Sequence, residues 1–517
     1  MSWVIAAQAR PIVLGTNSGQ DLALSSVSFQ SRGVFVIRGA LLCLVAGVIA
    51  ASTSFASAQN AAMRLLSLAN PSAPGARVTL RAEVDGLGGG APTGSVSFAD
   101  GSVHMGSARL AVLGAGQAAY SAGGGHTCAL SQTGGLKCWG DNLNASIGDG
   151  TATDRKTPVD VPGLTSGVVA VAAGDGHTCA LTRAGGVKCW GENSDGEVGD
   201  GTVSQRKLAP AGVVGLANGV VAIAAGGNHS CALTATGGVK CWGYNGSGQL
   251  GDGTTSTRAT PVNVVGLTAG VIAIAAGDRH TCALTRAGAL KCWGDNIYGQ
   301  IGDGATTNRM KPASVLGLGG AASAVSLGYT HSCALMKTGG VKCWGYNGAG
   351  QLGDGTRITR WTPVDVLGLT STIVAIDVGS NHACALTAAG GVECWGENRY
   401  GQLGDTTTIN RSTPVAVAGL ASGVAALSAG NRHSCALTVG GASLCWGSDS
   451  DGRLGIGGVA PTIRTRPAST LSFAGLVRAS AAFTTPALAA GSHAMKASYG
   501  GDAGHSASSG TLQQKVQ

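Results

Sequence analysis

Two cysteines and a histidine recur together in this chain, with a spacing that suits either a disulfide or a metal site. In the stretch HTCALTRAGGVKCWG, His177 stands two residues before Cys179, and Cys189 follows ten residues later, directly before a tryptophan. Thiolate and imidazole groups are ligands for zinc, whereas two cysteines placed opposite each other across a hairpin can form a disulfide. Which of the two forms depends on how the strands and turns around these residues position them.

The same phrase occurs seven times at steps of 51 or 52 residues. Each copy reads His-[Ser/Thr/Ala]-Cys-Ala-Leu, then a turn, then Cys-Trp-Gly. The histidines are His126, His177, His229, His280, His331, His382 and His433. The cysteine pairs are Cys128 with Cys138, Cys179 with Cys189, Cys231 with Cys241, Cys282 with Cys292, Cys333 with Cys343, Cys384 with Cys394, and Cys435 with Cys445. A fixed period of this length indicates a repeat architecture.

Each repeat contains short apolar runs that are typical of strands. GVVAVAAG (167–174) is rich in valine and closed by glycine, and HTCALT and GVKCWG follow with a tight turn between them. A segment such as TPVDV comes last, and its proline suits an edge strand. Four strands per repeat and seven repeats predict an all-β fold, a seven-bladed β-propeller. A β-solenoid is the structural alternative.

The hairpin of each repeat places its two cysteines opposite each other. If Cys179 pairs with Cys189, Leu181 faces Val187, and a three-residue loop ends at Gly185. Such loops commonly end in a left-handed residue, which glycine adopts without a steric clash. Directly opposed Cβ atoms lie about 4.5–5.5 Å apart, close enough for a disulfide after a small adjustment. We therefore predict seven disulfides, one in each repeat.

Metal binding and free packed thiols are the alternatives. His177, Cys179 and Cys189 offer three ligands, but the repeat lacks the short Cys-x₂₋₄-Cys knuckle and an identified fourth ligand. We expect no metal and no cofactor.

The N-terminal segment resembles a signal peptide. Residues 39–51 form an apolar run that is too short to span a membrane comfortably, Arg32 and Arg38 precede it, and ASA at 56–58 offers a cleavage site. We predict a leader over residues 1–58, which contains Cys43, and a secreted or envelope-associated mature protein whose fourteen cysteines are all paired. If the leader is not cleaved, it is a candidate membrane anchor.

Arginines recur just before the proline of the last segment of each repeat. They are Arg155, Arg206, Arg258, Arg309, Arg360, Arg411 and Arg464. Six repeats carry an aspartate just upstream: Asp149, Asp200, Asp252, Asp303, Asp354 and Asp405. A ring of free arginines would attract nucleic acid or an acidic partner, but pairing with these aspartates makes them structural. We favour pairing, with Arg464 the arginine that lacks such a partner, so a nucleic-acid partner is not expected.

The repeat resembles that of the regulator of chromosome condensation (RCC1) family. The stretch AAGDRHTCALTRAGALKCWGDNIYGQIGDGATTNR (275–309) contains Ala-Gly, x-x-His, Trp-Gly, x-Asn and a Gly-Gln-x-Gly close to the Gly-Gln-Leu-Gly of that family, and the resemblance covers residues 122 to about 470. It implies a seven-bladed propeller. The founding member acts on nucleosomes and on a small GTPase inside the cell, whereas secreted bacterial relatives bind other proteins through the propeller. A leader and disulfides favour the second type of role.

The flanks resemble a bacterial immunoglobulin-like repeat. Residues 71–110 match the front of such a domain, and residues 481–509, with LAAGSH and SYGGD, match its rear. We predict a front part over 59–120, a propeller over 121–480 inserted into the sandwich, and a rear part over 481–517. Two separate half-domains are the alternative.

No asymmetric catalytic constellation departs from the repeat, so we expect no catalytic residue and no enzyme. The seven histidines and the tryptophans that follow the second cysteines are assigned to hydrogen bonding and packing within the repeats.

Residues that the repeat does not explain are better candidates for function. Tyrosine, tryptophan and arginine dominate protein-binding hot spots. The candidate partner-binding residues are Trp361, Tyr346, Tyr298, Tyr244, Tyr329, Tyr400, Arg357 and Arg399. Their alternative interpretation is scattered surface residues with no shared face. The predicted function is non-catalytic binding of another protein at the cell surface or outside the cell. Envelope architecture or adhesion through glycan, and an enzyme acting on an extracellular polymer, are the alternatives.

Overall fold

The computed structural model describes residues 62–67, 72–86, 92–112, 119–458, 461–502 and 505–516, and every element within them is a β-strand. These residues belong to one compact unit, Ala56–Gln517. The predicted leader over residues 1–58, including Cys43, lies outside the described residues. Within the described part of the chain, no helix is long and apolar enough to cross a membrane.

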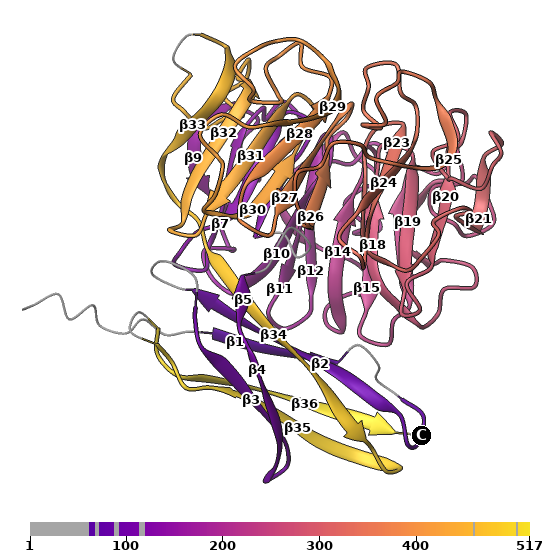
Figure 1. The fold of residues 1–517 in the computed structure, drawn as a ribbon, viewed down its shortest axis with the longest axis vertical. Coiled ribbons are helices and arrows are strands. Elements are labelled where there is room, and N and C mark those ends of the chain that lie inside the picture. The colour runs from indigo at the N-terminus through magenta and orange to yellow at the C-terminus, as the bar shows by residue number, and fades with distance from the viewer. Residues whose placement is uncertain are drawn as a thin grey trace, which may run out of the picture. The chain divides into compact units, whose positions relative to one another are not determined.

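Seven consecutive four-stranded sheets follow one another along the chain, one for each sequence repeat (Figure 1). We call them repeat sheets 1 to 7. Repeat sheet 1 contains β6 (Tyr120–Ala122), β7 (His126–Leu130), β8 (Leu136–Gly140) and β9 (Arg155–Asp160). Repeat sheet 2 contains β10 (Val168–Ala173), β11 (His177–Thr182), β12 (Val187–Glu192) and β13 (Arg206–Gly212). Repeat sheet 3 contains β14 (Val220–Ala225), β15 (His229–Thr234), β16 (Val239–Gly243) and β17 (Arg258–Asn263).

The remaining four sheets repeat this arrangement. Repeat sheet 4 contains β18 (Val271–Ala276), β19 (His280–Thr285), β20 (Leu290–Gly294) and β21 (Arg309–Ser314). Repeat sheet 5 contains β22 (Ala322–Leu327), β23 (His331–Met336), β24 (Val341–Gly345) and β25 (Arg360–Asp365). Repeat sheet 6 contains β26 (Ile373–Val378), β27 (His382–Thr387), β28 (Val392–Gly396) and β29 (Arg411–Ala416). Repeat sheet 7 contains β30 (Val424–Ala429), β31 (His433–Thr438), β32 (Ala442–Ser448) and β33 (Ile463–Ala474).

The second and third strands of each repeat sheet form the hairpin that carries the cysteines. In repeat sheet 2, Cys179 lies opposite Cys189 and Leu181 opposite Val187, which is the register expected from the sequence. Gly185 ends the loop with a φ of 80°, a left-handed conformation that favours glycine.

All seven cysteine pairs are joined as disulfides, each with a Cα–Cα distance of 4.1 Å. The bonds join Cys128 to Cys138, Cys179 to Cys189, Cys231 to Cys241, Cys282 to Cys292, Cys333 to Cys343, Cys384 to Cys394, and Cys435 to Cys445. This pairing is the one that the sequence predicts, with one disulfide in each repeat sheet. The fourteen cysteines of the repeats are therefore neither free thiols nor metal ligands.

Backbone hydrogen bonds connect the turns after the first strands into a closed ring. The Asn431 N–H donates to the carbonyl of Gly123 at 3.1 Å and thereby joins repeat sheet 7 to repeat sheet 1. The other links run from Gly124 to Gly174, Asp175 to Gly226, Gly227 to Gly277, Asp278 to Gly328, Tyr329 to Ser380 and Ser380 to Gly430. The first strands of all seven repeat sheets therefore line one central channel.

A second set of hydrogen bonds links neighbouring repeat sheets through the side chains of the repeat histidines. His126 Nε2 lies 2.7 Å from Thr178 Oγ1 in the next repeat sheet, and that hydroxyl donates to the carbonyl of Ser146, which also accepts from Trp190 Nε1. Because the hydroxyl already donates to the carbonyl, the imidazole is the donor in the first bond. Burial lowers the pKa of His126 to about 3, so the ring is neutral at ordinary pH.

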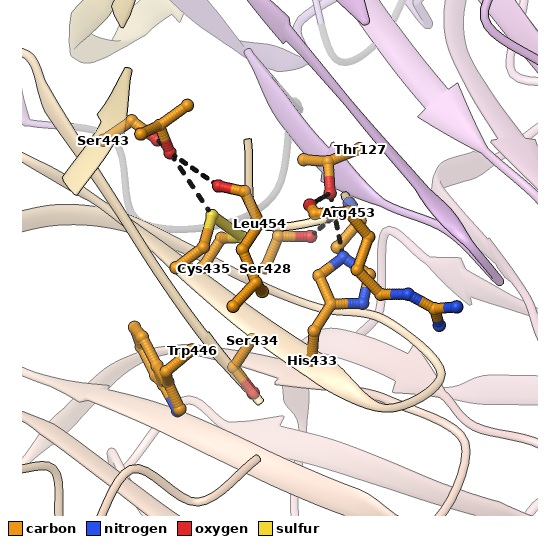
Figure 2. Close-up of a disulfide and its surroundings, with 12 residues drawn as sticks. Thr127, Ser428, His433, Ser434, Cys435, Ser443, Trp446, Arg453 and Leu454 are labelled. Atoms are coloured by element: carbon orange, nitrogen blue, oxygen red, sulfur yellow. Dashed lines mark hydrogen bonds between the residues drawn. A yellow bond between two sulfur atoms is a disulfide. The ribbon is translucent and has the colours of Figure 1, made fainter. Parts of the chain in front are cut away.

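The same set of hydrogen bonds joins the last repeat sheet to the first. Figure 2 shows His433 directed at Thr127, with 2.8 Å between Nε2 and Oγ1, beside the disulfide of Cys435. The remaining links join His177 to Ser230, His229 to Thr281, His280 to Ser332 and His382 to Ser434. Six of the seven histidines and all seven tryptophans thus have the hydrogen bonds or packing that the sequence assigns to them.

Repeat sheet 6 breaks this pattern, because Ala383 stands where the other repeats have serine or threonine. Both ring nitrogens of the buried His331 lack a hydrogen-bond partner among the described residues. We expect Ala383→Ser to raise the free energy of unfolding by about 0.5–1.5 kcal/mol, because the new hydroxyl joins His331 to the Gln351 carbonyl. Denaturant unfolding of both proteins measures the difference.

The reverse change, Ser434→Ala, is the matched control. It should destabilise the chain by leaving His382 without its partner. Equal unfolding midpoints for the Ala383→Ser variant and the unsubstituted chain would contradict this explanation.

The flanking segments build a further pair of sheets together. Their strands are β1 (Ala62–Ser67), β2 (Arg77–Gly86), β3 (Ser95–Asp100), β4 (Val103–Arg109), β5 (Ala111–Val112), β34 (Val477–Ala487), β35 (Gly491–Tyr499) and β36 (Ser508–Val516). The sheet orders are β1-β2-β34-β5 and β36-β35-β3-β4, so each sheet mixes front and rear strands. Phe98 and Phe483, one from each segment, stack with ring centroids 5.1 Å apart. We call this unit the split domain.

The boundaries differ from the predicted ones by a few residues. Tyr120, assigned to the front part, belongs to the first strand of repeat sheet 1 and packs edge-on against Trp139. Residues 477–480, assigned to the propeller, already pair with β2, where Val477 lies opposite Gly86. Backbone pairing, which the local sequence of QAAYS and SAAFTT does not reveal, sets both limits.

The recurring arginines are engaged by carboxylates, with two variations. Five arginines contact the upstream aspartate of their own repeat, at distances of 2.5–3.0 Å: Arg155, Arg258, Arg309, Arg360 and Arg411. In repeat sheet 2, Lys207 takes the place beside Asp200, and Arg206 donates to the carbonyl of Leu143. In repeat sheet 7, the aspartate position is occupied by Ile456, and the charge of Arg464 favours the ionised form of Asp449.

Candidate functional site

One edge of the repeat sheets carries all the turns after the first strands and all the loops after the third strands. In repeat sheet 2, β10 and β12 run in the same direction because both pair antiparallel with β11. The turn 174–176 and the loop 193–205 therefore emerge at the same edge. We call the surface formed by these turns and loops in all seven repeat sheets the loop face.

The eight candidate partner-binding residues lie on or beside the loop face. Seven are in its turns and loops: Tyr244, Tyr298, Tyr329, Tyr346, Arg357, Arg399 and Tyr400. Trp361 is the second residue of β25, next to the loop that precedes this strand. The repeat topology therefore brings residues from repeat sheets 3 to 6 to a common edge.

Three of these aromatic residues lie close together where repeat sheets 4 and 5 meet. The rings of Tyr298 and Tyr346 have centroids 5.0 Å apart and are tilted by 56°. Trp361 packs against Gly299, where a Cβ atom would come within 2.6 Å of Trp361 Cδ1. The Tyr346 N–H donates to the carbonyl of Thr330, the residue after Tyr329, and Tyr329 lines the channel.

We call Tyr329, Tyr346, Tyr298 and Trp361 the aromatic stripe. Their exposed fractions are 44, 36, 37 and 52%. It extends from the mouth of the channel, where Tyr329 is a lining residue, to the outer strand β25. Ile297 and Ile358, which the sequence analysis did not single out, are 55 and 60% exposed beside it. Exposed aliphatic residues in loops carry no sequence signal of their own, which is why they were missed.

The other candidates lie outside the stripe. Tyr244 is in repeat sheet 3, where its hydroxyl packs against Gly246. Tyr400 lies under the Arg432 guanidinium, 4.8 Å from the ring centroid, in a cation–π contact. Arg399 is largely exposed and 3.7 Å from Glu397, and Arg357 is exposed in the loop that leads to Trp361.

The charge on the loop face is uneven. Repeat sheets 1 and 2 contribute Asp141, Asp175, Glu192, Asp195 and Glu197. Burial raises the pKa of Glu197 to about 7, an effect that hydrogen bonds from its own backbone N–H, the Asp195 N–H and Asn228 partly offset. Burial, helped by the nearby Asp175, raises the pKa of Asp278 to about 7 as well. The negative charge of Asp278 in turn raises the pKa of Tyr329.

Sequence reasoning missed the carboxylates and arginines of the turns before the histidines. Asp175, Asp278, Arg279 and Arg432 occupy the two positions before His, where the seven repeats differ from one another. That variation was a usable signal, because a scaffold position that changes from glycine to aspartate or tyrosine is not required by the fold.

The residues considered for metal binding form a disulfide and a hydrogen bond instead. Cys179 and Cys189 are bonded to each other, and His177 Nε2 lies 2.8 Å from Ser230 Oγ. In the described ranges, no three histidine, cysteine, aspartate or glutamate side chains gather in a group that could hold a metal ion.

The model of the RCC1-like domain matches residues 103–372 and 217–503 of this sequence. The chain belongs to the RCC1-like domain family. The ultraviolet-B receptor UVR8 of Arabidopsis thaliana is 33% identical over 345 residues, which cover 65% of this chain and 78% of the receptor.

Solved structures share the RCC1-like fold. Human WBSCR16 is similar with a TM-score of 0.59 and 22% identity, over 66% of this chain and 98% of that chain. Prp20p of Saccharomyces cerevisiae is similar with a TM-score of 0.55 and 24% identity, over 61% of this chain and 81% of that chain. The repeated four-stranded sheets of this all-β protein are those of an RCC1-like repeat protein.

Proposed function

We propose that this RCC1-like protein binds another protein through the aromatic stripe of its loop face. The supporting observation is the stripe itself, whose four aromatic side chains are exposed and are not required by the repeat. The rings of Tyr298 and Tyr346 pack together, and Trp361 packs against Gly299, the residue after Tyr298. Tyrosine and tryptophan supply large contact areas with few rotatable bonds, and such residues dominate binding energy when they cluster.

The partner is proposed to be a protein, and the role to be non-catalytic. Prp20p is described together with its binding to Gsp1p and histones, and UVR8 is named a receptor. Both descriptions support a binding role for an RCC1-like repeat. Nucleic acid is a poor fit, because five of the seven recurring arginines are paired with aspartates and do not form a free basic ring.

The site of action is proposed to be the cell surface or the extracellular space. Seven disulfides are typical of proteins that fold in an oxidising compartment, and the leader predicted over residues 1–58 agrees with export. We further propose that the seven repeat sheets are the seven blades of the propeller and that the split domain is an immunoglobulin-like sandwich. The closed ring of hydrogen bonds and the two mixed sheets support these two assignments.

Partner capture tests the binding proposal. The mature chain, produced in an oxidising compartment and immobilised, is exposed to envelope extract and culture fluid from the host, and the affinity of any captured protein is measured after purification. We expect the double change Trp361→Ala and Tyr346→Ala to weaken binding at least tenfold, about 1.4 kcal/mol or more, because both side chains lie in the stripe.

Tyr244→Ala is the matched control, because Tyr244 lies on the same face but outside the stripe. It should leave the affinity unchanged. A partner that binds the double variant as tightly as the unsubstituted chain would refute the assignment of this surface. Capture of wall glycan in place of protein would refute the class of partner.

A further inference from the structure

The first strands of the seven repeat sheets enclose a cavity of about 650 Å³. Most side chains that line it are small and apolar, including Ala172, Ala224 and Ala275. The corresponding positions of repeat sheets 1, 5 and 7 carry Ser121, Ser326 and Ser428, and β26 carries a carboxylate there, Asp377. A carboxylate adds a charge that alanine and serine lack at this position, and a buried charge is costly without a cationic partner.

Asp377 is fixed in the channel wall by neutral groups. Its Oδ1 accepts a hydrogen bond from Ser326 Oγ at 2.8 Å, and its Oδ2 accepts from the Ala429 N–H at 2.9 Å. None of the described ion pairs involves it. Burial raises the pKa of Asp377, an effect that these hydrogen bonds oppose.

The mouth of the channel at the loop face carries two more carboxylates. Asp175 and Asp278 occupy equivalent positions in the turns of repeat sheets 2 and 4. Arg279 is 3.4 Å from Asp278. Asp175 takes part in none of the described ion pairs, and its pKa is raised by burial and by Glu192.

The other charged residues that line the channel are already paired with carboxylates. Arg478 contacts Asp85 at 2.6 Å, and Arg81 contacts Glu83 at 3.5 Å. Among the lining residues, the negative charges of Asp175 and Asp377 are therefore the ones without a cationic neighbour.

The spacing of the carboxylates defines the length of a suitable ligand. Asp377 precedes Ser380 by three residues, and Ser380 is the residue equivalent to Asp175 and Asp278 at the mouth. At about 3.3 Å per residue along a strand, Asp377 lies about 10 Å below the mouth. An alkyl chain of four or five methylene groups covers most of this depth.

We propose that the channel binds a primary alkylammonium group, with the ammonium at Asp377 and the alkyl chain against the alanine, valine and isoleucine walls. The ammonium donates charge-assisted hydrogen bonds to the carboxylate, and a second amine is placed near Asp175 and Asp278. Free diamines and the lysine side chain of a protein present the same chemistry.

Titration calorimetry with 1,5-diaminopentane on the full chain tests this site. We expect saturable binding of the diamine and none of pentan-1-ol, which has the same chain length without the charge. Asp377→Asn should weaken diamine binding at least tenfold, because an asparagine can accept from the Ala429 N–H and donate to Ser326 Oγ but carries no charge. Asp175→Asn, at the exposed mouth, should weaken it about threefold.

Asp365→Asn is the control for a lost surface carboxylate, because Asp365 is 70% exposed and paired with Lys342 outside the channel. Its affinity for the diamine should equal that of the unsubstituted chain. Thermal unfolding of the Asp377→Asn variant without ligand checks that it is folded. Equal binding of pentan-1-ol, or undiminished diamine binding by a folded Asp377→Asn variant, would overturn the proposal.

A second arm distinguishes the two sources of the ammonium group. Nα-acetyl-lysine N-methylamide should bind if the channel accepts a lysine side chain, and diamine binding without lysine binding identifies a free amine. This inference does not rest on the proposed protein partner. The double variant with Trp361→Ala and Tyr346→Ala should bind the diamine as tightly as the unsubstituted chain does. Either proposal can therefore be refuted without refuting the other.

Discussion

Replacement of both Cys179 and Cys189 by alanine is expected to lower the free energy of unfolding by about 2–4 kcal/mol. The disulfide closes a short loop between β11 and β12, and its loss increases the conformational entropy of the unfolded chain. Both sulfur atoms are buried between repeat sheets, so the truncation also removes packing. Guanidinium unfolding, followed by the fluorescence of the buried tryptophans, measures the difference.

Reduction provides the control for the packing contribution. When both proteins are unfolded in the presence of a strong reductant, the difference between them should shrink to the packing loss alone. If the double alanine variant unfolds at the same denaturant concentration as the oxidised parent, the disulfide contributes nothing, and the hairpin register accounts for the stability of the sheet.

Glu197→Gln is expected to raise the free energy of unfolding by about 1–3 kcal/mol at pH 8. Glu197 is fully buried on the loop face, and burial raises its pKa from 4.5 to about 7. The folded state therefore holds the proton more tightly than the unfolded state. The stability associated with this residue is fully present below pH 4.5 and is lost as the pH rises through 7.

The chain supplies a template for this substitution. Gln249, Gln300, Gln351 and Gln402 occupy the equivalent position in four other repeats. Gln351 Nε2 donates to Asn381 Oδ1 at 3.3 Å, in the same geometry in which Asn228 now donates to Glu197. A glutamine at 197 can form this bond once the Asn228 amide is turned.

Unfolding measured at several pH values checks the sign of the effect. The gain from Glu197→Gln should be largest at pH 8 and vanish near pH 4, where the glutamate is protonated in both states. The buried histidines lose stability on acidification in both proteins, and their contribution cancels in the difference. A gain that is the same at pH 4 and pH 8 would show that packing, and not ionisation, is responsible.

The sequence was sufficient for the parts of the fold that repetition specifies. The alternation of HTCALT and GVKCWG around a glycine turn determines the hairpin register, and Cys179 faces Cys189 for that reason. The same logic placed Asp149 beside Arg155, because both residues recur with the same spacing. Because the pattern occurs seven times, the copies together specify the strand boundaries and the register that a single copy would leave uncertain.

Contacts between distant residues were harder to foresee. The pairing of Val477 with Gly86 joins segments separated by the whole repeat region, and nothing in the local sequence of either one marks the register. The interaction of Lys207 with Asp200 was missed because Arg206 was the recurring residue and its neighbour was not.

The sequence selects the residues of the candidate site by type but does not predict their geometry. Trp361 and the tyrosines were singled out because the repeat did not explain them. Their adjacency depends on where the loop after β20 meets β25, as in the contact of Gly299 with Trp361. The carboxylates at Asp175, Asp278 and Asp377 become a group only when seven first strands are arranged around a channel.

Amide hydrogen exchange of the mature chain, alone and bound to its captured protein partner, tests the central claim most directly. We predict slower exchange in the bound state at residues 296–301, 328–331, 346–350 and 360–362, which carry the aromatic stripe. The equivalent loops of repeat sheets 1 and 2 should exchange equally in both states. Protection confined to the split domain, or to the hairpin loops at the opposite edge of the repeat sheets, would contradict the assignment of the loop face as the binding surface.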